Sequence, residues 1–332
     1  MNLRKIFFSC VFAIAASTFL FAQDAHFSQF YEAPLLLNPS RAGFINGTYQ
    51  LSGVYKSQWT SADIPFKTIN GTLNLNVPAG KNKNNIFGIA FSDFADKAGD
   101  ASYTTNHFDG TLSFHKNFGT DFNQYIGAGI TGSFASTTFD YSKLIFDENF
   151  MNGINSESIG TEKANYTDLA IGAEYNFLND DRQWNGGIAV YHLFKPTVSY
   201  SGNGESTIYR KYVLNFGYAK EISSSITAMP KAAAFIQGPS KELILGGDVK
   251  FDLTQNSTTN YAIYAGVYYR VGDALIPKFR IDMGDLCIGF SYDFTTSGLA
   301  EISNSKGGPE LSLIYKGRVK GISAGRIYNP RF

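Results

Sequence analysis

The alternation of apolar with small or polar residues is the feature that most limits how this chain can fold. From residue 24 onward it recurs in segments of about ten positions, most of which end in a turn rich in Gly, Asn, Asp or Ser. In residues 68–77, the even positions hold only threonine and asparagine, whereas the odd positions hold isoleucine, glycine, leucine and valine. Because successive strand side chains point to opposite faces, each segment would form a strand with one polar and one apolar face. This pattern is typical of membrane β-barrels, whose strands face lipid on one side and water on the other.

The beginning of the chain favours a membrane barrel over a soluble β-sandwich, which could show the same alternation. Arg4 and Lys5 precede an apolar stretch over residues 6–21, and Ala22 is a small residue after it. This order predicts a secretory signal peptide over residues 1–22. No later stretch reaches the roughly 18 to 20 consecutive apolar residues of a transmembrane helix, so the chain fits the periplasm, the surface or the outer membrane.

Composition narrows the class of protein further. Of the two cysteines only Cys287 lies beyond the predicted signal peptide, which excludes an internal disulfide framework. Basic and acidic residues balance at 28 each, so neither a nucleic-acid-binding surface nor a disordered tail is indicated. The 20 tyrosines and 29 phenylalanines fit the aromatic girdles of a membrane barrel.

The alternation also predicts the individual strands. The stronger candidates cover residues 47–57, 67–77, 85–95, 103–118, 124–136, 165–177, 184–195, 208–220, 242–253, 260–271, 276–283, 285–294 and 309–317, and the weaker ones cover 137–145 and 226–236. Single-chain bacterial barrels close with an even number of strands, so one of these fifteen candidates is wrong or one more is missing, and we expect about fourteen. Pro230 cannot donate a ladder hydrogen bond and predicts a bulge or a different start for the strand at 226–236. The predicted fold is all-β, a transmembrane antiparallel up-and-down barrel over residues 47–317.

The two faces of the predicted strands differ in chemistry. The apolar, lipid-facing residues include Phe87, Ile89, Phe91, Phe108, Leu112, Phe114, Leu169, Ile171, Ala173, Tyr175, Leu243, Leu245, Val249, Phe251 and Leu253. The lumen-facing residues include His107, Asp109, Thr111, Ser113, His115, Asp168, Glu174, Asp248, Lys250 and Asp252. Arg270 has the same parity as Tyr264 and Tyr268, which predicts that its guanidinium lies against their rings. The tight turn at 283–285 is expected on the periplasmic side and the long polar connection at 146–164 on the outer side.

The residues that most often carry catalysis or bind metals give no site. Of the four histidines, only His107 and His115 share a predicted strand face, but they lie about 26 Å apart along a strand, too far for one metal ion. Ser113 is two residues from His115 on the same face, yet such a pair arises readily by chance. The glycines within 127–129 lack the context of a nucleotide-binding loop and favour barrel curvature or close packing. We therefore predict no enzyme, no metal site and no cofactor.

The segment before the first strand has a different character. Residues 24–43 alternate poorly and contain two prolines. Phe27, Phe30 and Tyr31, with the leucines at 35–37, would form an aromatic and aliphatic surface that needs cover. Residues 23–46 could therefore plug the lumen without a partner, or dock one, and the sequence leaves both open.

Several separate stretches resemble the PorP/SprF family of outer-membrane proteins, which is associated with the type IX secretion system of Bacteroidetes. The opening of the mature chain, FSQFYEAPLLLNPSRAG at 27–43, is similar to the opening of that family. YKSQW at 55–59, DKAG at 96–99 and AVYHLFKP at 189–196 resemble a basic Gln-Trp stretch, a polar-Ala-Gly turn and a His-Leu-x-x-Pro segment of the family. Residues 289–313, from GFSYDF to GGPELSL, extend the resemblance to the last predicted strand.

The resemblance implies an outer-membrane barrel that works in secretion and gliding machinery and not as an enzyme. Family members are linked to periplasmic lipoproteins of that machinery and to export or surface anchoring of large adhesins, so lipoproteins or a secreted adhesin are the implied partners, with outer-membrane lipid around the barrel. The residues expected to bind a partner are Phe27, Phe30, Tyr31, Pro34, Asn38 and Pro39 in the opening segment, and Arg326, Tyr328 and Arg331 in the basic tail over 318–332. Such a tail could dock an acidic partner surface, although a solvated terminus fits it equally well.

A diffusion channel or transporter of small hydrophobic solutes is the alternative function. The two classes differ physically, because a docking barrel can fill its lumen with side chains, whereas a channel must keep a continuous wet path. The hydrophobic segment before the first strand favours docking. Deletion of residues 24–43 is therefore expected to abolish partner association and to leave membrane insertion intact.

Overall fold

The computed structural model describes most of the chain. The described residues are 24–58, 66–80, 84–99, 101–118, 123–143, 161–200, 206–254, 261–298, 300 and 305–320. The predicted signal peptide at 1–22 and the tail residues Arg326, Tyr328 and Arg331 lie outside them, so the predictions made for these residues stay predictions. Most of the connection at 146–164 also lies outside them.

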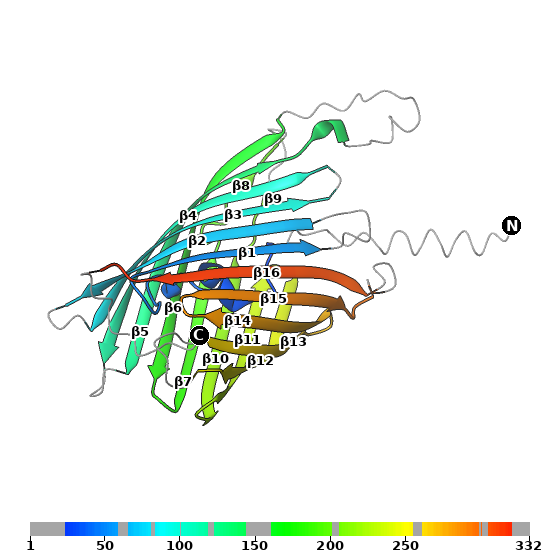
Figure 1. Ribbon diagram of the computed structural model, residues 1–332. Coiled ribbons are helices and arrows are strands. Elements are labelled where there is room, and N and C mark those ends of the chain that lie inside the picture. The colour runs from blue at the N-terminus through cyan, green and yellow to red at the C-terminus, as the bar shows by residue number, and fades with distance from the viewer. Residues whose placement is uncertain are drawn as a thin grey trace, which may run out of the picture.

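Fourteen strands of the described residues close into an antiparallel barrel (Figure 1). They are β1 (Tyr49–Gln58), β2 (Phe66–Ala79), β3 (Asn85–Ala98), β4 (Tyr103–Phe118), β5 (Gln124–Thr138), β6 (Lys163–Leu178), β7 (Arg182–Tyr191), β10 (Lys211–Ser223), β11 (Ile226–Gln237), β12 (Ser240–Asp252), β13 (Tyr261–Arg270), β14 (Ala274–Met283), β15 (Leu286–Thr295) and β16 (Lys306–Gly317). Each pairs with its neighbour in sequence, and β16 pairs with β1 to close the sheet. β7 pairs directly with β10, because β8 (Thr197–Val198) and β9 (Ser206–Thr207) form a separate two-stranded sheet. The predicted all-β barrel of about fourteen strands is confirmed.

Of the two weaker strand candidates, one is correct and one is wrong. Residues 226–236 lie in β11. The candidate at 137–145 is wrong over its described part, because β5 ends at Thr138 and the 3-10 helix η4 (Tyr141–Lys143) follows. The prediction for Pro230 is also wrong, since β11 keeps its register with β12 through the proline. On the β10 side, two residue pairs are missing at Pro230, and the pairing then resumes in the same register. The missing N–H of Pro230 therefore causes no shift in strand register.

Side-chain burial follows the alternation and is inverted relative to a soluble protein. Outward-facing apolar residues are exposed, with Phe91 at 56% and Phe108 at 62% of full exposure. Inward-facing polar residues are buried, among them Thr111, His115 and Glu174. A β-sandwich would bury its apolar face, so these strands have an apolar outer surface around a polar lumen. The predicted parities of the two faces are confirmed.

The two ends of the barrel differ in their connections. At one end, here called the short-turn end, tight turns such as 224–225 and 284–285 join the strands, β1 begins and β16 ends. The opposite end, here called the long-loop end, has the connections 139–162, 192–210 and 296–305. Bacterial barrels have their short turns on the periplasmic side, so we assign the short-turn end to that side.

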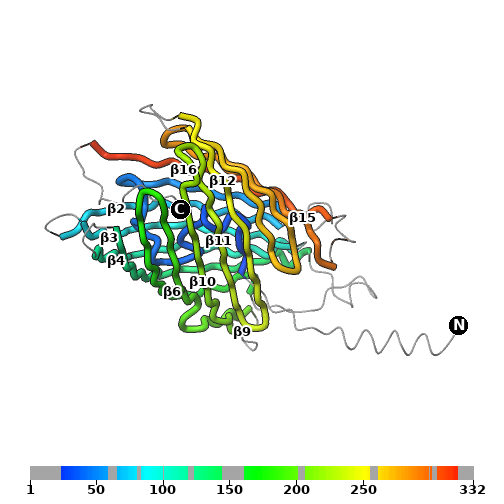
Figure 2. Tube along the Cα trace, turned by 90° about the horizontal axis from the view of Figure 1, so that it is seen from below, coloured from blue at the N-terminus to red at the C-terminus, as the bar shows by residue number. Residues whose placement is uncertain are grey.

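Residues 24–48, here called the plug, lie inside the barrel, where Figure 2 shows them in dark blue among the strands. They form the 3-10 helices η1 (Phe30–Glu32) and η2 (Pro39–Arg41), with the short helix α2 (Pro34–Leu37) between them. Prolines occupy the first positions of α2 and η2, where an N–H would have no partner within the helix. Asn38 caps η2 by accepting a hydrogen bond from the Ser40 N–H at 3.0 Å. None of the described helices is long and apolar enough to cross a membrane.

Candidate functional site: the plug in the barrel lumen

The plug runs through the lumen from one end of the barrel to the other. Its first residue, Asp24, contacts Lys211 and Gln237, which stand where β10 begins and β11 ends, at the long-loop end. Its last residue, Thr48, donates its N–H to the Gly317 carbonyl at the short-turn end. At the short-turn end the plug continues directly into β1. Along the rest of its length, the plug is held by contacts with the barrel wall.

Ionic contacts hold the plug at the long-loop end. The Asp24 carboxylate lies 2.7 Å from Lys211 Nζ and 2.8 Å from His192 Nε2, and His192 Nδ1 lies 2.7 Å from Asp168. Burial would raise the pKa of Asp24, but Lys211 and His192 hold it well below its usual range. Burial would lower the pKa of His192, but Asp24 and Asp168 raise it to about 9. At neutral pH His192 is therefore a cation between two carboxylates.

The raised pKa of His192 predicts that this end of the plug loosens in alkaline solution. The imidazolium stabilises the folded arrangement fully below its ordinary pKa of about 6.5, and this contribution is lost as the pH rises through about 9. The contact between Lys211 and Asp24 remains, so we expect loosening and not release. A nitroxide label on Ala25→Cys, in a Cys287→Ser background, should become more mobile over this pH range. The transition should be absent in His192→Gln, and its persistence there would contradict the assignment.

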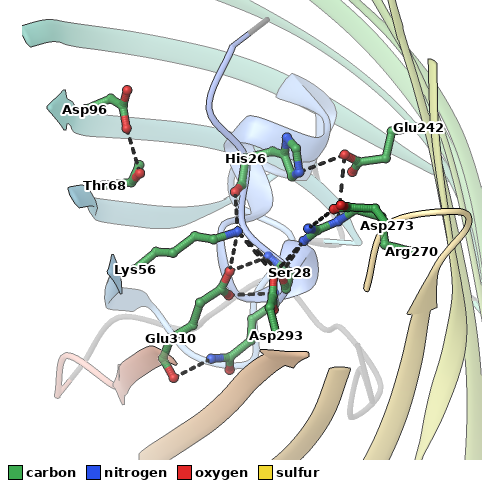
Figure 3. Close-up of polar contacts among 11 residues, drawn as sticks. His26, Ser28, Lys56, Thr68, Asp96, Glu242, Arg270, Asp273, Asp293 and Glu310 are labelled. Carbon is green, nitrogen blue, oxygen red and sulfur yellow. Dashed lines mark hydrogen bonds and ion pairs between the residues drawn. The ribbon is translucent and has the colours of Figure 1, made fainter. Parts of the chain in front are cut away.

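Glu310 of β16 binds the plug backbone, as Figure 3 shows. Its two carboxylate oxygens accept the N–H groups of Ser28 and Gln29 at 2.7 and 2.9 Å. The Gln29 side chain donates to the Glu310 carbonyl at 3.2 Å and accepts from Ser312 Oγ at 2.9 Å. Lys56 Nζ lies 3.1 Å from the Glu310 carboxylate and balances its charge. A fully buried carboxylate thus satisfies two plug N–H groups that have no partner in a helix or strand.

A second group of charges lies beside this contact (Figure 3). Ser28 Oγ donates to Asp293 at 2.8 Å, and Arg270 contacts both Ser28 Oγ and, at 3.0 Å, Asp293. His26 Nε2 lies 2.8 Å from Glu242, whose carboxylate also lies 3.8 Å from Arg270 Nε. The plug is therefore joined to β12, β13 and β15 through one continuous set of polar contacts.

The prediction that Arg270 lies against Tyr264 and Tyr268 is wrong. These rings are covered instead by β14, with Arg280 at 4.9 Å from the Tyr264 centroid and Lys278 at 5.9 Å from the Tyr268 centroid. Carboxylates bind a guanidinium through charge-assisted hydrogen bonds, which are stronger than its attraction to a ring face. Arg270, Tyr264 and Tyr268 do lie on one strand face, but the carboxylates around Arg270 come from β12, from β15 and from the turn after β13.

Glu32 is the acidic anchor in the middle of the plug. Lys278 Nζ lies 2.8 Å from its carboxylate and Arg280 Nη1 lies 3.3 Å from it. The two cations compensate the charge of the buried Glu32 carboxylate. Arg280 also pairs with Asp282 at 2.7 Å. Loss of any one partner would leave an uncompensated charge in the lumen.

Asn38 and Arg41 fix the plug to β6 and β7. Asn38 Nδ2 donates to the carbonyls of Ala173 and Ile188 at 3.1 and 3.2 Å. Arg41 Nε lies 2.9 Å from Glu174 Oε2, and both side chains are buried. These contacts attach the plug to the wall at η2, close to where it meets the first strand.

Glycines on the lumen face let the plug backbone approach the wall. A Cβ on Gly129 of β5 would overlap the Pro39 carbonyl, and one on Gly172 of β6 would overlap the Asn38 side chain. A Cβ on Gly88 of β3 would overlap a further plug carbonyl. These glycines form a seat for the plug, a close approach of the kind expected for the glycines within 127–129.

Ser113 Oγ lies 3.3 Å from His115 Nε2, and both groups bind the plug. Ser113 Oγ donates to the Ala42 carbonyl at 2.6 Å, and His115 Nε2 lies 3.0 Å from the same oxygen. A ring nitrogen that donates to a carbonyl cannot accept the serine proton. His107 lies instead 3.3 Å from the Tyr166 hydroxyl. Among the described residues, no cluster of histidine, cysteine and carboxylate side chains could hold a metal ion.

The structure places every described residue of the predicted partner-binding set in the plug. Phe27, Phe30, Tyr31, Pro34, Asn38 and Pro39 are all buried there. A partner could reach them only if the plug left the lumen, and partner binding by them stays a prediction. Sequence reasoning missed Asp24, Glu32 and Arg41, whose charges hold the plug. Each is a single charged residue in a largely apolar segment. A buried charge needs a partner, so these three residues could have been recognised in the sequence as contact residues.

A protein-family comparison identifies the class of barrel. The model of the type IX secretion system membrane protein PorP/SprF matches residues 19–315. The chain belongs to the PorP/SprF family. This PorP/SprF barrel, with its apolar outer surface, lies in the outer membrane. The stretches that carry the resemblance meet at the plug, since Lys56, His192 and Glu310 come from three of them and all contact it.

Solved structures of other barrels are similar to this PorP/SprF barrel. A Pseudomonas aeruginosa FadL homologue has a TM-score of 0.50 and 10% identity, over 84% of this chain and 92% of its own. The Ralstonia pickettii toluene transporter TbuX has a TM-score of 0.48 and 11% identity, over 88% of this chain and 95% of its own. At 10% identity the likeness to the FadL homologue concerns the fold alone. No curated protein matches the sequence.

Proposed function

We propose that this barrel is a non-enzymatic component of the type IX secretion machinery that docks periplasmic lipoproteins and supports export or surface anchoring of secreted proteins or adhesins. Membership of the PorP/SprF family supports the secretion setting. The short-turn end, assigned to the periplasm, is the end that lipoproteins could reach. The long-loop end is the end from which exported proteins could be held.

The filled lumen is the observation that carries this proposal. The plug is buried and bound along its length through Asp24 to β10, Ser28 and Gln29 to β16, Glu32 to β14 and Arg41 to β6. A diffusion channel needs a continuous wet path through its lumen, whereas a plugged barrel presents two rigid ends. A closed and internally braced barrel is better suited to holding partners than to passing solutes.

A channel for small hydrophobic solutes is the second candidate, favoured by an apolar pocket at the long-loop end. The apolar part of its lining comes from Phe27, Phe30, Leu36, Leu37 and Phe235. Asp24, His26 and Lys211 supply the polar side chains of the lining. Its cavity volume is about 20 Å³, room for about one water molecule, so a small solute would fit only if the pocket widened. The plug itself forms much of this pocket, so passage of a solute would require the plug to move.

Affinity purification from the native outer membrane tests the docking proposal. Tagged protein, extracted gently in detergent, is expected to retain secretion lipoproteins or a large adhesin in stoichiometric amounts by quantitative mass spectrometry. An unrelated outer-membrane barrel purified in the same way is the control. Recovery of this barrel alone, or equal recovery of the same proteins with the control barrel, would contradict docking and favour a solute channel.

Deletion of residues 24–43 tests whether the plug itself takes part in partner association. The deletion is expected to abolish co-purification of partners. It also removes the plug groups that compensate Glu310 and Lys278, so the folded state of the variant has to be checked by its heat-dependent migration in a denaturing gel. Retention of the partners by a folded deletion variant would contradict a role for the plug in docking.

A further inference from the structure

We propose that a second copy of this barrel docks within the membrane on the outer face of β2, β3 and β4, around Asp93. The three strands lie side by side in the sheet (Figure 1). Such a contact between two barrels lies beyond the proposed function, which concerns lipoproteins and exported proteins. Asp93 is a charged side chain that a surface facing only lipid would not need.

Asp93 is an exposed carboxylate on the outward side of β3. It alternates with Ser92 and Phe94, which are buried in the lumen, and shares its face with the exposed Phe91. Of the outward-facing strand residues that the structure describes, Asp93 is the one carboxylate. The outward lysines and Arg182 all lie within three residues of a strand end, whereas Asp93 lies five residues from the nearer end of β3.

The position of Asp93 along β3 lies inside the apolar band of the barrel. Phe87 and Lys97 mark a length of ten residues on the outer face of this strand, which is about 33 Å. At the tilt of about 40° found in membrane barrels, this length spans about 25 Å of height, which is the height of the apolar band. Asp93 lies between them, with Ala95 above it and the exposed Phe108 of β4 paired beside it. Lipid tails would therefore surround this carboxylate in an isolated barrel.

A carboxylate is costly at this depth unless a cation meets it. The Asp93 side chain makes no hydrogen bond or ion pair within the described part of the chain. Charged side chains in the hydrocarbon region are rare and almost always pair with another charge or with a polar backbone group. Lipid tails offer neither, so we expect a cation from another protein surface at Asp93.

The same outer face carries two lysines without a carboxylate partner. Lys67 of β2 and Lys97 of β3 are exposed and stand directly opposite each other. Neither makes an ion pair among the residues that the structure describes. Like charges that are directly opposite across two strands destabilise a sheet. Lys97 lies about 13 Å along the strand from Asp93, so the two cannot pair within one chain.

A second copy fits this face because the face is complementary to itself in shape. A two-fold axis along the membrane normal places one side of the face against the other side of the same face in the second copy. On one side of Asp93, Gly71 of β2 leaves a hollow, because an added Cβ there meets no atom within 4 Å. On the other side, the Phe108 ring projects and is 62% exposed. The ring of each copy is thus opposed to the glycine hollow of the other, and small residues allow close approach.

The charges also meet across such an axis. On a strand tilted by about 40°, the separation of Asp93 and Lys97 consists of about 10 Å of height and about 8 Å sideways. The axis can remove the sideways part, because it brings opposite sides of the face together. A lysine side chain lies along apolar surface on a long flexible stem, so Lys67 or Lys97 of one copy can reach Asp93 of the other.

Association of two differently tagged copies tests this inference. Full-length copies with a histidine tag and with a Strep tag are expressed together and extracted from the outer membrane in mild detergent. Purification through one tag is expected to recover the other copy. Asp93→Leu, which suits a lipid-facing surface, should lower this recovery about tenfold through loss of the charge pair. Gly71→Leu fills the hollow and should lower the recovery about tenfold as well.

An exchange of charges shows whether the ion pair itself joins the copies. The Asp93→Lys copy and the Lys67→Glu/Lys97→Glu copy each place like charges in the contact, so neither should associate with itself. Expressed together, they restore opposite charges at both contacts and should associate about as well as two wild-type copies. Mixing would not reverse a loss of association that came only from damage to the fold.

Matched controls make the same changes elsewhere on the outer surface. Lys163→Glu/Lys241→Glu reverses two exposed outward lysines at the long-loop end of other strands and should associate as the wild type does. Gly186→Leu adds the same side chain to the outer face of β7 and is the control for Gly71→Leu. Heat-dependent gel migration shows for each variant whether the barrel is folded.

The proposed contact is overturned if the wild type recovers no second copy, or if folded Asp93→Leu associates as the wild type does. Failure of the two folded charge-exchanged copies to associate with each other would overturn it too. Recovery of a different membrane protein that Asp93→Leu releases, without a second copy, would overturn the docking of two copies and assign this face to that protein.

Discussion

The Gly129→Val variant is expected to lose its plug from the lumen and to admit solutes that the wild-type barrel excludes. The added side chain would overlap the Pro39 carbonyl, a backbone group that cannot swing aside. Overpacking of this kind costs on the order of 1–3 kcal/mol where neighbours can adjust, and more where they cannot. Conductance of the purified protein in planar bilayers measures the change, with the wild type expected to be closed.

Gly132→Val is the matched control for this prediction. Gly132 lies on the same strand, and a Cβ added there meets no atom within 4 Å, so this variant should stay closed. Gly172→Val offers a second disruption of the seat, from β6, in case Gly129→Val fails to insert. If folded seat variants conducted no more than Gly132→Val, the plug would not be seated against this wall as described.

Glu310→Gln is expected to destabilise the barrel by on the order of 3–5 kcal/mol. The substitution removes the charged acceptor of the Ser28 and Gln29 N–H groups and leaves Lys56 without its nearest carboxylate. Urea-induced unfolding from lipid vesicles, followed by tryptophan fluorescence, measures the loss. Asp181→Asn, at an exposed turn position, should change the unfolding free energy by no more than about 0.5 kcal/mol.

A double substitution shows whether the cost comes from the unpaired charge. Lys56→Met/Glu310→Met removes both members of the pair and should be less destabilised than the sum of the two single methionine variants, because no buried charge is left alone. Additive costs would mean that Lys56 and Glu310 are not coupled. The stability of the plug contact would then come from the hydrogen bonds of Glu310 alone.

Most of the fold could be predicted because lipid and water make opposite demands on the two faces of a strand. Lipid-facing and lumen-facing residues alternate along each strand, so the local sequence pattern revealed the strands and the face on which each side chain lies. This holds even for β11, which contains the exposed Pro230. The error at 137–145 has a physical origin in pairing. β5 loses its partner after Thr138, which is opposite Lys163, the first residue of β6, and alternation alone does not report where a partner begins.

The contacts of the plug could not be predicted, because each joins residues far apart in the chain. Ser28 and Glu310 are separated by 282 positions, and Arg41 and Glu174 by 133. Periodicity shows which face a side chain lies on, but not which other strand it meets. Hydrophobicity was enough to single out Phe27 and its neighbours as a segment that needs cover, whereas nothing local distinguished Glu310 from other residues of the last strand.

The contact at Glu310 also has a consequence for the order of folding. Lys56 of β1 stands directly opposite Glu310 of β16, so the pair bridges the seam at which the barrel closes, and Ser28 and Gln29 bind the same carboxylate. Residues 24–48 are synthesised before any strand, yet their acceptor arrives only with the last one. Contacts across such a sequence separation form late, because the intervening chain must be ordered first. The first segment of the barrel is thus secured only after its final strand has joined, and its seating reports that closure is complete.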